Sequence, residues 1–212
     1  MRIKKIKSNL NQISFIIPIY NEEERLPFLL NYLKKYSKKN KNKEIIFVND
    51  GSKDKSEELI HKFIINNKRK NFNFEIITYK KNMGKGYALK RGVLRSKKQW
   101  ILTVDADLSV KFEQVDIWRK KNFLNTKKNI AYFGSRIIKG SNMKALFIRK
   151  FIGFFFRIFQ NLIIGSEIKD TQCGFKLYNS VYAKEIFTNL KTNGFAHDVE
   201  LIYLLKKKIL KY

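Results

Sequence analysis

Four short apolar runs alternate with three segments of helical periodicity in the first half of the chain. The apolar runs have the length of buried strands, and the first helical segment carries Leu26, Leu29, Leu30 and Leu33 along one face. This alternation constrains the fold most, because successive βαβ units build a mostly parallel α/β sheet with helices on both faces. The predicted strands are residues 13–18, 44–48, 74–78 and 100–104, and the predicted helices are 22–36, 54–64 and 86–96.

Each predicted strand is followed by a polar motif, in chain order "YNEEE", "NDGSKD", "NMGKG" and "DADL". Ligands of parallel sheets bind at the carboxyl ends of the strands. The four motifs should therefore meet at one edge of the sheet, and we expect the functional site there. Part of "NDGSKD" is expected to be structural, because Asp54 and Glu57 form a capping pattern for the next helix.

Asp105 and Asp107 follow the fourth predicted strand directly. Side chains two residues apart in an extended strand point to the same side. Two carboxylates on one side suit Mg²⁺ or Mn²⁺ that also holds substrate phosphates. The D-x-D pattern is common by chance, so its place at a strand end is what favours a metal site.

Other strand-end residues could contact a nucleotide. Asp50 lies where a carboxylate can hold a base or ribose, and Lys85, between two glycines, can meet a phosphate. The glycine spacing matches neither a P-loop nor a dinucleotide fingerprint. Arg136, in "GSR" after a further predicted strand at 131–134, suits a phosphate or else a surface ion pair.

The second half holds fewer chemical signals. His197 and Asp198 in "GFAHDVEL" could be an acid/base pair, a support for the metal, or a capped helix start. Cys173 is the single cysteine, so a disulfide framework is excluded, a reducing compartment is indicated, and a buried thiol is expected.

The formal charge is +27, with many more Lys than Arg. Part of this excess is typical of an AT-rich genome, and the rest favours anionic partners such as nucleotides, phospholipid headgroups or nucleic acid. A basic nucleic-acid-binding module is the non-enzyme alternative. It is disfavoured because the basic residues are spread along the chain without a recognition motif. The basic N-terminus does not resemble a signal peptide, and no apolar run of about 18 residues is free of charge.

Residues 143–165, "MKALFIRKFIGFFFRIFQNLIIG", are rich in Phe and Ile but interrupted by basic side chains. This mixture predicts amphipathic helices at a membrane interface. The alternative is a helix buried against the sheet or at the interface of a homo-oligomer. The chain stops at "LLKKKILKY", partway through a predicted helix, so we expect one domain, 1–212, that is truncated at its C-terminus.

The motifs together resemble family 2 glycosyltransferases of the GT-A fold, a Rossmann-like α/β architecture. The matching pieces are "IIPIYNEEERLP", "IIFVNDGSKD", "NMGKGYALKRGV", "ILTVDADLS", "YFGSR", "DTQCGFKLY" and "GFAHDVEL". They cover nearly the whole chain and stand in the family's order. The likeness is greatest to the polyprenyl-phosphate branch, the enzymes similar to dolichyl-phosphate β-glucosyltransferase. Ser109 stands where mannosyl enzymes of this branch usually have Gln, which favours a glucosyl donor.

The resemblance implies a role for each matching position. It divides the chain into a nucleotide-sugar half, about 10–110, and an acceptor half facing the membrane, about 111–212. Asp105 would lie near the ribose or the metal, Asp107 would bind Mg²⁺ or Mn²⁺, and Asp198 matches the position of the catalytic base. Arg136 and Arg149 would hold the acceptor phosphate or the donor diphosphate. The donor site would be lined by Pro18, Tyr20, Asn21, Glu22, Asp50, Gly84 and Lys85.

The implied reaction is an inverting transfer of a sugar, with UDP-glucose as the expected donor and a polyprenyl or dolichyl phosphate as acceptor. It would take place at the cytoplasmic face of a membrane, on a peripheral enzyme, with no nucleic-acid partner. Three alternatives remain at this stage: a GDP-mannose donor, a saccharide acceptor, and a truncated inactive relative that acts as a binding subunit.

Overall fold

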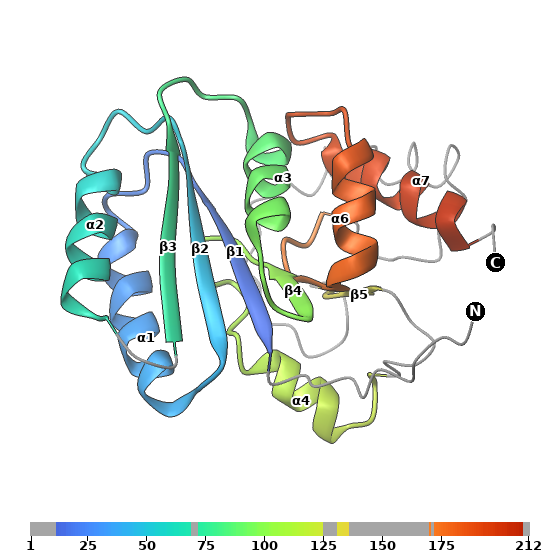
Figure 1. Ribbon diagram of the computed structural model, residues 1–212, viewed down its shortest axis with the longest axis horizontal. Coiled ribbons are helices and arrows are strands. Elements are labelled where there is room, and N and C mark those ends of the chain that lie inside the picture. The colour runs from blue at the N-terminus through green and yellow to red at the C-terminus, as the bar shows by residue number, and fades with distance from the viewer. Residues whose placement is uncertain (1–11, 69–71, 125–130, 136–169, 171, 210–212) are drawn as a thin grey trace, which may run out of the picture.

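The computed structural model describes residues 12–68, 72–124, 131–135, 170 and 172–209. Six strands form one sheet in the order β3-β2-β1-β4-β6-β5 (Figure 1). The first four strands in the chain are parallel to one another, and β6 is antiparallel to both β4 and β5. Their bounds are β1 Ile13–Ile19, β2 Lys43–Asp50, β3 Phe72–Tyr79, β4 Trp100–Thr103, β5 Ala131–Phe133 and β6 Lys176–Asn179.

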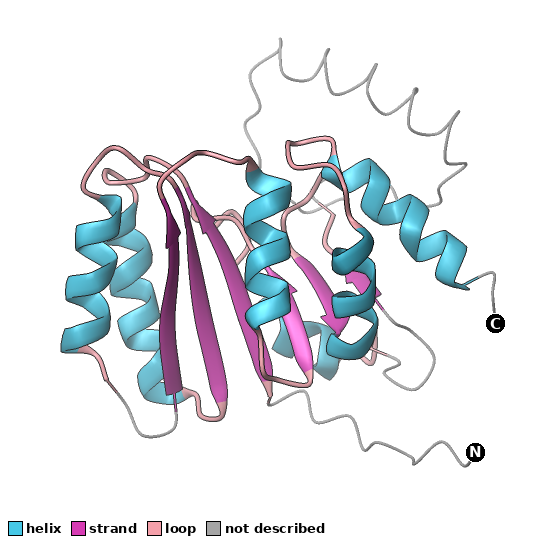
Figure 2. Ribbon diagram, turned by 45° about the horizontal axis from the view of Figure 1, so that its top comes forward, coloured by secondary structure: helices cyan, strands magenta, loops and turns pink. Residues whose placement is uncertain are grey.

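Helices cover both faces of the sheet, as Figure 2 shows. Residues of α1, α2 and α4 pack on one face, and residues of α3, α6 and α7 pack on the other. β1 and β2 are buried almost throughout because both faces of a parallel sheet need apolar cover. The bounds are α1 Leu26–Lys39, α2 Ser56–Asn66, α3 Lys85–Arg95, α4 Gln114–Lys120, α6 Ser180–Asn189 and α7 His197–Ile209.

The predicted α/β alternation is confirmed in the first half, with two local corrections. α1 begins at Leu26, four residues after its predicted start at 22, and the residues before it form a turn closed by the Glu22 carbonyl oxygen. Of the expected Asp54/Glu57 capping box, only the cap at Asp54 is confirmed. Asp54 accepts the backbone N–H groups of Ser56 and Glu23, whereas the Glu57 carboxylate accepts the Asn49 amide.

The second half completes the sheet. β5 confirms the strand predicted at 131–134. β6, which begins within "DTQCGFKLY" and ends one residue after it, was not predicted as a strand. Cys173 is buried, as expected for a structural thiol. In the part of the chain that the structure describes, no helix is long and apolar enough to cross a membrane. The predicted membrane-interface segment 143–165 lies outside the described residues.

Candidate active site

A cleft of about 400 Å³ opens at the carboxyl ends of the parallel strands. All four polar motifs contribute to it, as predicted from their positions after the strands. A fifth contribution comes from Phe195, in the loop before α7. The cleft is lined by Pro18, Ile19, Tyr20, Glu22, Arg25, Asp50, Asn82, Gly84, Lys85, Asp105, Ala106, Asp107 and Phe195.

The aspartate doublet reaches this cleft by a different geometry from the predicted one. β4 ends at Thr103, and Asp107 lies in a turn that follows, where Leu108 has a positive φ of 52°. The prediction that strand alternation aligns Asp105 and Asp107 is therefore wrong. The turn, rather than the strand, brings both carboxylates to the cleft.

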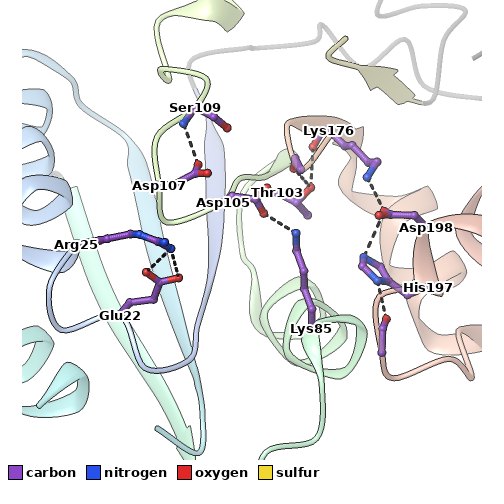
Figure 3. Close-up of polar contacts among 12 residues, drawn as sticks. Glu22, Arg25, Lys85, Thr103, Asp105, Asp107, Ser109, Lys176, His197 and Asp198 are labelled. Atoms are coloured by element: carbon purple, nitrogen blue, oxygen red, sulfur yellow. Dashed lines mark hydrogen bonds and ion pairs between the residues drawn. The ribbon is translucent and has the colours of Figure 1, made fainter. Parts of the chain in front are cut away.

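Among the described residues, Lys85 is the cation that pairs with Asp105 of the doublet. Its Nζ lies 2.6 Å from Oδ1 of Asp105, and both side chains are partly exposed (Figure 3). Lys85 is the first residue of α3, so the turn into this helix carries the ammonium group to the end of β4. The ion pair holds the Asp105 carboxylate in one position at the edge of the cleft.

Gly174 makes room for Asp105, a role that the sequence did not reveal. A Cβ atom added at Gly174 would meet the carboxylate of Asp105. Gly174 precedes β6, and its carbonyl oxygen accepts a hydrogen bond of 2.9 Å from the Thr103 hydroxyl. The "DTQCGF" motif thus fits tightly against the end of the strand that carries the doublet.

The two carboxylates fit a hard divalent cation. Asp107 is exposed, and its Oδ1 accepts the Ser109 N–H at 2.9 Å, while its Oδ2 has no protein partner among the residues described. No group of three His, Cys, Asp or Glu in the described ranges could hold a metal. The protein would therefore supply Asp105 and Asp107, and a bound Mg²⁺ or Mn²⁺ would complete its shell with substrate phosphates and water.

Asp50 is buried at the end of β2 and fixes the loop that leads to α3. Its two carboxylate oxygens accept the backbone N–H groups of Met83 and Gly84 at 2.7 and 2.8 Å. This carboxylate is thus engaged with the protein backbone on the floor of the cleft. Its expected contact with a base or ribose stays a prediction.

The glycines of "NMGKG" also serve a contact between elements. A Cβ at Gly84 would meet the backbone of Asn193, and a Cβ at Gly86 would meet Thr192 and His197. The Tyr87 N–H donates to the Asn193 carbonyl oxygen at 3.2 Å. The absence of side chains therefore lets α3 pack against the loop before α7, which carries Phe195 to the cleft.

The first motif contributes three of its four predicted residues to the cleft lining. Pro18, Tyr20 and Glu22 line it, whereas Asn21 is not among the lining residues. Asn21, at a positive φ of 53°, binds the next loop: its N–H donates to the Ser52 hydroxyl, and its side-chain oxygen accepts the Lys53 N–H. Asn21 thus joins the two loops that hold the rest of the motif in place.

Asp198 lies behind the cleft in a buried cluster with Lys176 and His197. Its Oδ1 is 2.5 Å from Lys176 Nζ and 3.3 Å from His197 Nε2, and the exposed fractions of the Lys176 and Asp198 side chains are 3% and 8%. His197 Nδ1 is 2.8 Å from the Gly194 carbonyl oxygen. Burial lowers the pKa of His197, although the Asp198 charge acts to raise it.

The predicted catalytic residues are thus only partly placed. Asp198 does not line the cleft, and Lys176, which pairs with it, was not singled out from the sequence. Lys176 lies in β6, and its closeness to His197 and Asp198 follows only once the position of that strand is known. Arg136 and Arg149 lie outside the described residues, and their roles stay predictions.

Comparison with known proteins gives one consistent family. The sequence profile of glycosyl transferase family 2 matches residues 14–187. The chain is 37% identical to a dolichyl-phosphate beta-glucosyltransferase of Dictyostelium discoideum and 35% identical to one of Homo sapiens, over 208 residues each. The alignments cover 92% and 93% of this chain but 62% and 64% of those proteins. The chain therefore spans less than two thirds of their length.

A solved structure with a similar fold is the mannosyltransferase PcManGT from Pyrobaculum calidifontis, in complex with GDP-Man and Mn²⁺. It is 13% identical, with a TM-score of 0.57, and the likeness covers 88% of this chain and 50% of that chain. At this identity the comparison supports the fold alone. It agrees with the GT-A architecture expected from the motifs.

Proposed function

Because the chain belongs to glycosyl transferase family 2, we propose that it transfers glucose from UDP-glucose to dolichyl phosphate. The carrying observation is the cleft at the strand ends, where Asp105 and Asp107 lie together with Lys85 and Asp50. The names of the relatives, which match more than 90% of the chain, support glucose as the transferred sugar and dolichyl phosphate as the acceptor.

In this proposal, Asp105 and Asp107 hold Mg²⁺ or Mn²⁺ on the donor diphosphate. The fit of two carboxylates to such an ion supports it. When bound, the ion would supply positive charge opposite the leaving nucleoside diphosphate. Lys85 would add a second positive charge at the same edge, while its ion pair keeps Asp105 oriented.

The proposed acceptor needs little or no deprotonation before it can react. A phosphate monoester is already ionised near neutral pH, so its oxygen needs no strong base to become a nucleophile. This agrees with the burial of Asp198 and its pairing with Lys176, which suit a positioning residue better than a base in contact with substrate. Attack of the phosphate oxygen at the anomeric carbon breaks the bond to the diphosphate and inverts that carbon.

We place the reaction at a membrane, because dolichyl phosphate is a lipid, and propose its cytoplasmic face, as the sequence resemblance implies. The net charge of +27 supports contact with anionic headgroups, and residues 143–165 are the segment proposed for this contact. Binding to vesicles with and without anionic lipid tests this part separately, with salt expected to weaken the interaction.

The function is tested by release of the nucleoside diphosphate, UDP or GDP, from a panel of nucleotide-sugars in the presence of Mn²⁺ and dolichyl phosphate. We expect release from UDP-glucose and not from GDP-mannose. Asp107→Ala should abolish it, whereas Asp116→Ala, which removes a carboxylate from α4 away from the cleft, should retain it. The proposal fails if no donor is turned over, or if the residual rate is unchanged in Asp107→Ala.

A further inference from the structure

A small, partly open pocket lies between the Lys85–Asp105 ion pair and the buried Lys176–Asp198 pair. Its volume is about 10 Å³, and both pairs contribute to its walls. Figure 3 shows the two pairs on either side of Thr103, with His197 next to Asp198. Two cations and two anions therefore surround a space of about 10 Å³. One ion pair lies at the cleft, and the other lies inside the protein.

Tyr178 also lines this pocket, from β6, and it carries an unusual hydroxyl group. The side chain is buried, and no hydrogen bond of good geometry reaches its Oη from the described residues, although the Thr103 hydroxyl lies near it and acts to lower the Tyr178 pKa. Burial, and then the charge of Asp198, raises the pKa of Tyr178, so the group stays a neutral donor. A buried hydroxyl without a partner is costly, and most such groups bind protein or ordered water.

We propose that this pocket binds one ordered water molecule, held by the Tyr178 hydroxyl and by charged groups of the two ion pairs. The volume is about that of one water-sized probe, which is the smallest space that holds a water. The second requirement is two to four polar partners, and the pocket offers more than that number. The rest of the pocket wall is apolar and includes Leu89, Phe187 and Leu201, which offer the water no further hydrogen-bond partner.

The water gives Asp198 a connection to the cleft that its own side chain lacks. Asp198 does not line the cleft, whereas Asp105 lines both the cleft and the pocket. Through the water, the buried Lys176–Asp198 pair helps to fix the Lys85–Asp105 pair, so that Tyr178 and Asp198 are positioning residues. This consequence rests on the proposed function, whereas the water site itself does not.

The sign of a stability change tests the water site. Tyr178→Phe removes only the hydroxyl oxygen. If that oxygen binds a water, the variant loses a hydrogen bond and we expect a lower Tm. If the oxygen has no partner, the variant loses only a desolvation penalty, and an unchanged or raised Tm would overturn the proposal. Tyr36→Phe is the matched reference, because the Tyr36 hydroxyl has a known partner, Lys43, at 2.7 Å.

A crystal structure at a resolution that shows ordered water gives a direct second readout. We expect one water within hydrogen-bond distance of Tyr178 Oη and of Asp198 or Asp105, and no such water in Tyr178→Phe. A direct bond from Tyr178 Oη to a protein group, with no water, would overturn the site.

Kinetics then test the positioning role. With UDP-glucose as donor, Tyr178→Phe should lower kcat several-fold with little change in the KM of the donor, whereas Tyr36→Phe should retain the wild-type kcat. An unchanged kcat in Tyr178→Phe would overturn the positioning role and leave the water site standing. Lack of turnover by the wild-type protein would instead refute the proposed function.

Discussion

Lys85 Nζ and Asp105 Oδ1 lie 2.6 Å apart at the edge of the cleft, in a contact that joins the start of α3 to the loop after β4. The pair unites two of the four strand-end motifs. It also means that Asp105 has a protein counter-ion before any substrate or metal is bound. We expect Lys85 to be as important as the aspartates for the order of the site.

Replacing Lys85 by Met should therefore disturb Asp105. Without the ammonium group, the carboxylate loses its partner and the donor phosphates lose a positive charge, so we expect kcat/KM for the donor to fall about 100-fold. The matched control is Lys62→Met, which breaks an exposed ion pair with Glu58 on α2 and should be neutral. Steady-state kinetics of both variants check this, and equal rates for Lys85→Met and wild type would contradict it.

Gly174→Ala should harm activity by displacing Asp105. The added methyl group would occupy the position of the carboxylate, so the carboxylate must move. A displacement of about 1 Å in a catalytic site can cost about 100-fold in rate. Gly194→Ala is the control, because a Cβ there meets no atom within 4 Å. Comparison of the two variants by activity and by thermal unfolding checks the prediction, which fails if both behave alike.

Lys176→Met should destabilise the fold, because it leaves the Asp198 carboxylate buried without its cation. Loss of one partner of a buried pair costs about 3–5 kcal/mol. The double variant Lys176→Met/Asp198→Leu removes the orphaned charge as well, so it should recover a large part of the loss. Urea unfolding of the three proteins measures this. A single variant as stable as wild type would show that the pair carries no such coupling.

His197 should make stability depend on pH. Burial lowers its pKa in the folded state below the ordinary value of 6.5, so the unfolded chain binds more protons in the window just below that value. The contribution of neutral His197 to the free energy of unfolding is therefore fully present above about pH 6.5. This contribution is lost as the pH falls toward the pKa of His197 in the folded state. His197→Asn should flatten this part of the curve relative to wild type.

Most of the parallel sheet could be predicted from the sequence because its strands are buried and short. Short apolar runs that alternate with helical segments are compatible with few folds other than a parallel α/β sheet. The predicted and observed elements differ only at their ends, as at Leu26 in α1. β6 was missed because it is four residues long and its first residue is Lys176, a charge that is buried only through its pairing with Asp198. A local pattern cannot show a partner 22 residues away.

The position of the candidate site could be predicted from the sequence, but the arrangement of its side chains could be predicted only in part. The convergence of strand ends followed from topology, which explains why Asp50, Lys85, Asp105 and Asp107 were found. Strand alternation failed for the doublet because β4 ends at Thr103 and Asp107 lies in the turn at 106–107. The role of Gly174 depends on a three-dimensional contact with Asp105, so no sequence pattern reveals it.

The central claim is tested most directly by following labelled glucose from UDP-glucose into the lipid fraction with dolichyl phosphate and Mn²⁺. We predict that wild-type protein produces a glucose-labelled lipid, that Asp107→Asn reduces the initial rate by about 100-fold or more, and that Asp116→Asn retains it. Label that never enters the lipid fraction, or that enters it equally well with Asp107→Asn, would contradict the account.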